Sequence, residues 1–146
     1  INTLKDWITS EDPRIKNNSG TADYTNTFTI KEIPSQPTYI NLGKVVAMAK
    51  VYLNGKYVGG AWTYPYRLNI TDYLQKGENT VKIEVVNNWV NRLIGDLKLP
   101  AEQRSTWTMV NPWRDDSQLQ SSGLFGPVRI ESHDYELLKF SPLSDN

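Results

Sequence analysis

Val-Tyr-Leu-Asn-Gly-Lys-Tyr-Val-Gly-Gly, residues 51–60, has the pattern of two β-strands joined by a tight turn. Asn54-Gly55 predicts a type I′ hairpin, because both central residues of that turn need a positive φ. The strand that leads into the turn, residues 45–53, starts apolar on both faces and is expected to be a central strand covered on both sides. Gly59-Gly60 predicts a bulge or a close approach of the backbone. The stretch therefore predicts a β-sheet protein.

Strand-like alternation continues on both sides of this hairpin. In residues 22–30 apolar side chains alternate with polar ones, as on a strand with one buried face. Thr71 is expected to cap a single helical turn over 71–74. Little alternation is found in 87–122, which is predicted to form long loops, and long loops in a compact domain usually carry function or an interface. The other expected strands are 38–42, 66–70, 81–85, 106–110, 135–140 and 126–131, the last with Val128 and Ile130 inward.

The strand pattern predicts an all-β fold in one domain that spans residues 1–146. An antiparallel jelly-roll β-sandwich with about eight or nine strands accommodates it best. At 146 residues the chain is long enough to bury a core without disulfides or metals. Because it starts at Ile1, without a methionine or a signal-type apolar segment, we interpret it as a piece of a longer protein.

The composition excludes several classes of function. The 16 basic and 16 acidic side chains balance, which argues against nucleic-acid binding, since that needs a concentrated positive field. Without cysteine there is no disulfide framework, zinc ribbon or thiol nucleophile, and a lone His133 disfavours a Ser-His-Asp triad or a multi-histidine metal site. No apolar run approaches the ~20 residues that a membrane-spanning helix needs, so no membrane insertion is expected.

Polar-tipped aromatics are the distinctive part of the composition, with five Trp and eight Tyr against three Phe. Sugars have apolar faces and polar edges, so their sites pair flat rings with hydrogen-bonding or charged groups. Such sets recur in the predicted loops, but the same rings could equally plug the ends of a sandwich or pack on a neighbouring domain. The candidate carbohydrate-binding residues are Trp62, Tyr64, Trp89, Arg92, Trp107, Trp113 and Arg114.

Charged residues in the predicted strands and loops have structural explanations. Arg92 and Asp96 are expected to form a clamp, an ion pair that pins the backbone. Glu84 and Glu131 alternate with inward apolar residues and are expected to face solvent, so no catalytic carboxylate pair is assigned. No cofactor is expected either. Calcium is the one metal left open, because jelly-roll loops often bind it, although no EF-hand spacing occurs.

Four segments together resemble the galactose-binding-like β-sandwich of family 2 glycoside hydrolases: VYLNGKYVG (51–59), YPY (64–66), NITDYL (69–74) and KGENTV (76–81). SGTADY (19–24) is similar to the first strand of that domain. WVNRLIGD (89–96) and SGLFGPV (122–128) resemble the C-terminal sandwich of bacterial family 106 α-L-rhamnosidases. The resemblance covers most of the chain, from about residue 6 to residue 131.

The resemblance implies a non-catalytic accessory domain of an exported polysaccharide-degrading glycoside hydrolase, with an extracellular or periplasmic location. Its partners would be carbohydrate, the catalytic domain of the same parent chain, or both. In such enzymes the catalytic carboxylates lie on a separate barrel, so no catalytic residue is carried over to this chain. Two alternatives stay open: a stand-alone jelly-roll glycosidase and a protein-interaction module.

Overall fold

The computed structural model describes residues 4–18, 20–109 and 111–132, and within them most of the regular secondary structure is β-strand. The strands are β1 (Thr21–Ile30), β2 (Thr38–Asn41), β3 (Lys44–Val46), β4 (Met48–Leu53), β5 (Lys56–Ala61), β6 (Arg67–Asn69), β7 (Gly77–Val86), β8 (Gly123–Gly126) and β9 (Arg129–Ser132). The helices are α1 (Pro13–Lys16) and α2 (Val90–Leu97), with 3₁₀ turns η1 (Trp7–Thr9), η2 (Thr71–Tyr73) and η3 (Ala101–Gln103).

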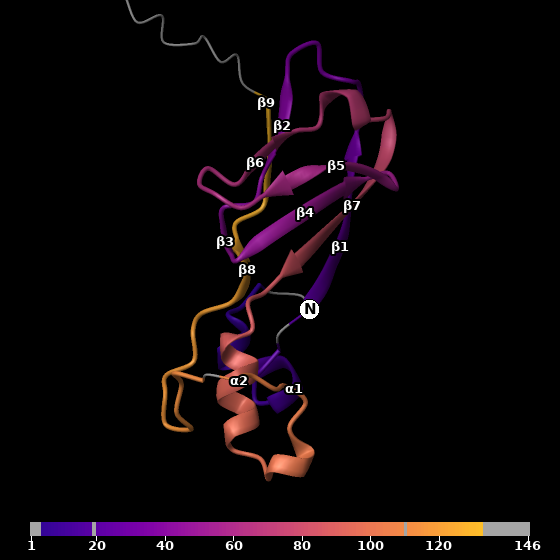
Figure 1. The fold of residues 1–146 in the computed structure, drawn as a ribbon. Helices are drawn as coiled ribbons and strands as arrows, with labels where there is room; N and C mark the ends of the chain where they lie inside the picture. Colours follow the sequence, from indigo (N-terminus) through magenta and orange to yellow (C-terminus); the bar gives the residue numbers. More distant parts are fainter. Residues whose placement is uncertain (1–3, 19, 110, 133–146) are drawn as a thin grey trace, which may run out of the picture.

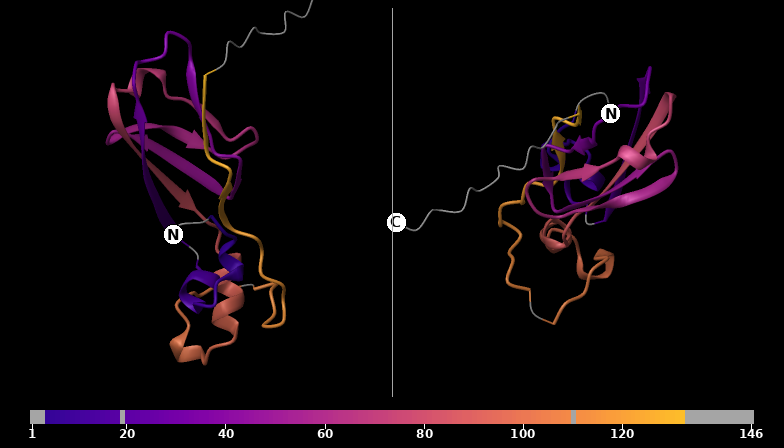
Figure 2. Two further views of the ribbon diagram at one scale, coloured as in Figure 1. Left: turned by 180° about the vertical axis from the view of Figure 1, so that it is seen from behind. Right: turned by 90° about the horizontal axis from the view of Figure 1, so that it is seen from above.

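The strands form two antiparallel sheets and a short ladder (Figure 1). One sheet has the order β1-β7-β4-β5, the other has the order β6-β2-β9, and β3 pairs with β8. Figure 2 shows α1, α2 and the segment that follows α2 gathered at one end of the strands. The predicted antiparallel β-sandwich is confirmed.

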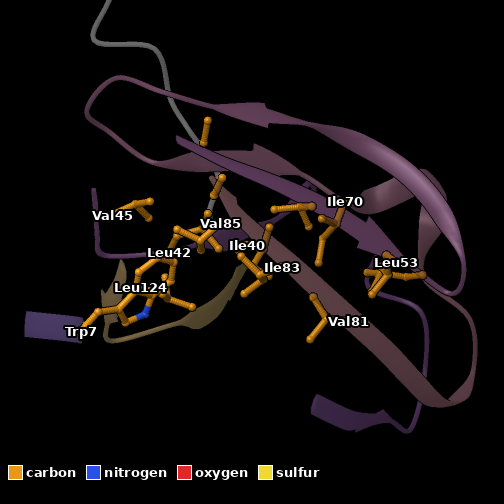
Figure 3. Close-up of a cluster of buried hydrophobic side chains, with 14 residues drawn as sticks. Trp7, Ile40, Leu42, Val45, Leu53, Ile70, Val81, Ile83, Val85 and Leu124 are labelled. Carbon is orange, nitrogen blue, oxygen red and sulfur yellow. The ribbon is translucent and has the colours of Figure 1, made fainter. Parts of the chain in front are cut away.

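The sandwich core consists of aliphatic side chains contributed by both sheets (Figure 3). In β4 every second residue is buried, because successive side chains of a strand point to opposite faces. Ile40 of β2 and Leu53 of β4 are fully buried, and Trp7 closes the core beside Leu124. Trp7 is thus a tryptophan that plugs an end of the sandwich, and its indole N–H donates to the Tyr24 hydroxyl (2.6 Å).

The predicted type I′ hairpin is present between β4 and β5, where Asn54 (φ 52°) and Gly55 (φ 78°) both have a positive φ. The Asn54 side chain also donates to the Asn79 side chain (2.9 Å) and accepts from the Thr80 backbone N–H (2.9 Å). Asn79 is fully buried and holds the turn before it through hydrogen bonds to Gln75. The hairpin and the turn into β7 are therefore joined by two asparagine side chains.

Two local predictions are corrected. Residues 45–53 form two strands, β3 and β4, because β3 leaves the large sheet to pair with β8 while β4 pairs with β7 and β5. Thr71 does not cap η2, since its hydroxyl accepts from the Thr38 N–H of β2 (2.9 Å) while Asn69 accepts from the Thr71 N–H. The inward direction of Ile130 is confirmed, since it lies opposite the fully buried Ile40 in the register, and it stays 39% exposed because an open hollow lies beside it.

The largest correction concerns 87–122. Residues 90–97, predicted as loop, form helix α2, whose apolar Val90, Leu93, Ile94 and Leu97 have helical spacing. The strand expected at 106–110 is wrong, because residues 106–109 form no strand in the described part of the chain. The strand expected at 135–140 lies outside the described residues.

Candidate functional surfaces

The predicted carbohydrate-binding residues fall into two separate regions. Trp62 and Tyr64 follow β5 and precede β6, within the strand body (Figure 1). The other five candidates belong to α2 or its flanking segments, which lie at the lower end of Figure 1: Trp89, Arg92, Trp107, Trp113 and Arg114. The seven residues therefore do not form one groove.

We call the end of the molecule that holds this second group the cap, defined as η1, α1 and residues 89–109 and 111–122, which include α2. The carboxylate of Asp96 on α2 is its main anchor. One oxygen, Oδ2, accepts the backbone N–H groups of Ser105 (3.0 Å) and Thr106 (2.8 Å), as well as both hydroxyls. The other oxygen lies 3.1 Å from Arg92 Nε, one helical turn away. Asp96 thus ties the segment after η3 to the helix.

The surroundings of Asp96 change its acidity. Burial raises the pKa of the carboxyl, but the hydrogen bonds from Thr106 and Ser105 and the Arg92 charge outweigh that effect. The net pKa lies below the ordinary value of 3.8. Asp96 is therefore ionised at neutral pH, as an acceptor of several N–H and O–H groups must be.

Two further polar side chains anchor the same segment near its end. The fully buried amide of Asn91 pairs with the backbone of Gln120, donating to its carbonyl (2.6 Å) and accepting its N–H (2.7 Å). The Asp6 carboxylate accepts the backbone N–H of Ser122 (3.0 Å), and the backbone N–H of Trp7 donates to the Ser122 carbonyl (3.0 Å). Residues 105–106 and 120–122 are therefore both fixed to the rest of the cap.

Between these anchors the segment exposes two large apolar side chains. Trp107 is 85% exposed and Met109 is 86% exposed. Trp107 lines one side of a hollow of about 360 Å³ together with Leu93 and Leu97 of α2. Trp113 is half-buried, while Arg114 is exposed. Trp89, just before α2, is also exposed. The cap thus presents apolar groups from a segment that is held at both ends.

Trp62 and Tyr64 face different surroundings although they are close in sequence. The benzene half of the Trp62 indole rests against Gly60 of β5, on the outer face of the large sheet. Tyr64 is 85% exposed and borders a separate hollow with Lys44 and Arg129. The two rings are therefore not one binding pair.

The carboxylates on the strands are paired with cations. Glu84 lies 3.3 Å from Lys50 Nζ, and Glu131 lies 3.5 Å from Arg67 Nε. Glu84 alternates with the buried Ile83 and Val85, so it points away from the other sheet, to which Glu131 belongs. The two glutamates therefore do not face each other as a catalytic pair. Among residues 4–18, 20–109 and 111–132, no three His, Cys, Asp or Glu side chains gather as metal ligands, and no helix there is long and apolar enough to cross a membrane.

Sequence reasoning missed the anchors other than Arg92 and Asp96. Asn91 and Asp6 hold backbone groups 29 and 116 residues away, and nothing in the local sequence indicates those partners. Asn79 had a weak signal, since it follows the glycine-bearing turn in KGENTV.

Comparison with known proteins gives consistent matches. Residues 5–119 match the family described as glycosyl hydrolase 2 galactose-binding domain-like. The chain is 37% identical to a putative beta-glucuronidase of Formosa agariphila over 87% of its own length and 13% of that protein. It is 32% identical to a beta-galactosidase of Priestia megaterium over 84% of its own length and 11% of that protein. The solved structure of a rhamnosidase from Novosphingobium sp. PP1Y matches with a TM-score of 0.78 and 43% identity, over 85% of this chain and 12% of that one.

Proposed function

The chain belongs to the galactose-binding domain-like family of glycosyl hydrolase 2, and from this premise we propose that it is a non-catalytic accessory domain of a larger glycoside hydrolase. Its cap packs against the catalytic part of the parent chain. The relatives' names support this parent class, because a glucuronidase, a galactosidase and a rhamnosidase each contain the domain as 11–13% of their length.

The observation that carries the docking role is the anchored apolar segment of the cap. A freely moving segment would lose much conformational freedom on docking, which lowers affinity. Here Asp96 and Asn91 hold the ends in place before any partner arrives, so Trp107 and Met109 are presented at little further cost. Aromatic residues and Met are enriched at the centres of protein interfaces, whereas charged residues are depleted there.

Export of the parent protein and contact with a glycan are further parts of the proposal. The first rests on the resemblance to enzymes that degrade polysaccharides outside the cytoplasm. The second rests on exposed aromatics, and of the seven candidates Trp62 has the most suitable surroundings, on the face of a sheet rather than in the cap. A structural calcium ion stays a prediction of the sequence.

Calorimetry of the intact parent protein tests the docking. A docked domain unfolds together with its neighbour, whereas a loosened one gives a separate transition. We expect Trp107→Ala with Met109→Ala to split a single transition into two. Ile33→Ala, which removes another exposed apolar side chain (54% exposed), is the matched control and should leave the single transition intact. An unsplit transition in the double variant would overturn the docking role of the cap.

A further inference from the structure

The outer face of the large sheet carries aromatic rings where β4 pairs with β5. Ala49, Val51 and Leu53 of β4 point into the core, so Lys50 and Tyr52 point outward. Tyr52 lies opposite Tyr57 of β5, with ring centroids 5.3 Å apart and planes inclined by 56°. Polar and charged residues dominate the rest of this face, which differs in that respect from the apolar tip of the cap.

Trp62 reaches the same place because Gly60 has no side chain. A Cβ on Gly60 would lie 3.0 Å from Trp62 Cζ3 and 3.3 Å from Cε3, so the ring occupies the space that a side chain would fill. The Tyr57 hydroxyl lies 3.6 Å from the same point. Trp62 and Tyr57 are nevertheless 65% and 54% exposed. Gly60 thus lets the Trp62 indole pack against the strand, while most of the ring stays in solvent next to the Tyr57 hydroxyl.

Charged groups lie beside the rings and balance each other. Lys50 is opposite Gly60 in the register, and its Nζ lies 3.3 Å from Glu84. Lys82 lies 3.6 Å from Asp23 and 3.9 Å from Glu84, and its Nζ stands 4.5 Å over the Tyr52 ring. Two ammonium groups and two carboxylates therefore border the rings, which gives this face hydrogen-bond donors and acceptors without net charge.

From this juxtaposition we infer that the outer sheet face around Trp62 and Tyr57 binds a neutral saccharide. The apolar face of a pyranose stacks on Trp62, and its hydroxyls bond to the Tyr57 hydroxyl, Lys50 and Glu84. The inference extends the proposed accessory role, because a sugar held here would keep a glycan near the catalytic part of the parent.

The composition of the face favours a sugar over a protein partner. Centres of protein interfaces are depleted of Lys, Glu and Asp, yet this face places Lys50, Lys82, Glu84 and Asp23 beside its rings. The balanced charges also favour a neutral sugar over a uronate or a sulfated glycan, because an anion would meet carboxylates as well as ammonium groups.

Isothermal titration calorimetry of this chain tests the inference, with cellotetraose, β-1,4-mannotetraose and β-1,4-galactotetraose as neutral probes and tetragalacturonate as the anionic one. We expect saturable binding of at least one neutral probe, and weaker binding of tetragalacturonate. Trp62→Ala should weaken the binding at least about tenfold. Gly60→Val keeps the indole but places a side chain in the space that the ring occupies, and it should also weaken the binding. Ile33→Ala, elsewhere on the surface, should bind as the wild type does.

Several results would overturn the site. These are no saturable binding at millimolar sugar, unchanged affinity in Trp62→Ala, or tighter binding of tetragalacturonate than of every neutral probe. Splitting of the parent's unfolding transition by Trp62→Ala would identify the face as a docking surface for protein instead. The docking test on Trp107 and Met109 does not involve Trp62, so each proposal can fail while the other stands.

Discussion

The sandwich and the cap of this chain are held together by different forces. Between the sheets, aliphatic side chains such as Ile40, Leu53 and Val85 are removed from water, and polar groups are few. In the cap, α2 and the segment after it are joined by Asp96 and Asn91, which bond to backbone groups. Apolar burial is spread over many contacts, whereas a polar anchor concentrates its effect in a few bonds. The cap should therefore respond to single substitutions and to pH in ways that the sandwich does not.

The largest effect is expected in the sandwich. Ile40 is fully buried, so Ile40→Ala removes apolar contacts and leaves a cavity. Such changes cost about 2–5 kcal/mol of the free energy of unfolding. Denaturant unfolding of the chain should show this loss as one cooperative shift, with every amide of β4 and β7 exchanging faster. A loss confined to the cap would contradict the assignment of Ile40 to the common core.

A smaller and local effect is expected from Asn91→Leu. The leucine is of similar size, but the backbone N–H and carbonyl of Gln120 each lose the hydrogen bond to Asn91. This loss lowers the free energy of unfolding by about 1–3 kcal/mol. Native-state hydrogen exchange should show faster exchange at Gln120 and Ser122, with unchanged protection at Val51 and Ile83. Equal loss of protection in the strands would mean that the cap and the sandwich unfold as one unit.

The smallest effect is a pH dependence of the cap. Because the pKa of Asp96 is lower in the folded chain than its ordinary value of 3.8, its stabilisation is complete above that value and is lost as the pH falls through the folded pKa. The NMR shifts of the Ser105 and Thr106 amides should move together in acid, below about pH 3.8. In Asp96→Asn that movement should be absent. If the amide shifts of the variant moved at the same pH as those of the wild type, the effect would belong to another group.

The sequence predicts the sandwich far better than the cap, and the reason is the range of the interactions. Strand alternation and Asn54-Gly55 are local signals, so β1, β4, β5 and β7 are found from the sequence alone. Helix α2 is missed because Gly95 lowers helix propensity by about 1 kcal/mol relative to Ala, and because Trp89 at the N-cap position cannot cap. The first N–H of the helix, that of Val90, bonds instead to the Asn88 side chain (3.1 Å). The bond from Asp6 to Ser122 joins residues 116 positions apart, which no local pattern reveals.

The candidate sites divide in the same way. The sequence names Trp62 and Trp107 as candidates from their residue type and polar neighbours, but it does not predict their exposure or the surface that each one shares. The position of the Trp62 ring depends on the absence of a side chain at Gly60, which pairs with Lys50 of β4. The position of Trp107 depends on the residue before it, Thr106, whose backbone N–H bonds to the Asp96 carboxylate. Such relations follow from the pairing of strands and the packing of a helix, which sequence spacing does not determine.

Hydroxyl-radical footprinting of the intact parent protein, read by mass spectrometry, tests the central claim most directly. The claim is that the cap meets the catalytic part while the outer sheet face stays open. Trp62, Trp107 and Met109 are all more than half exposed in this chain, so their oxidation rates in one sample are directly informative. We predict slow oxidation of Trp107 and Met109 and fast oxidation of Trp62. Oxidation of Trp107 and Met109 as fast as that of Trp62 would contradict the account.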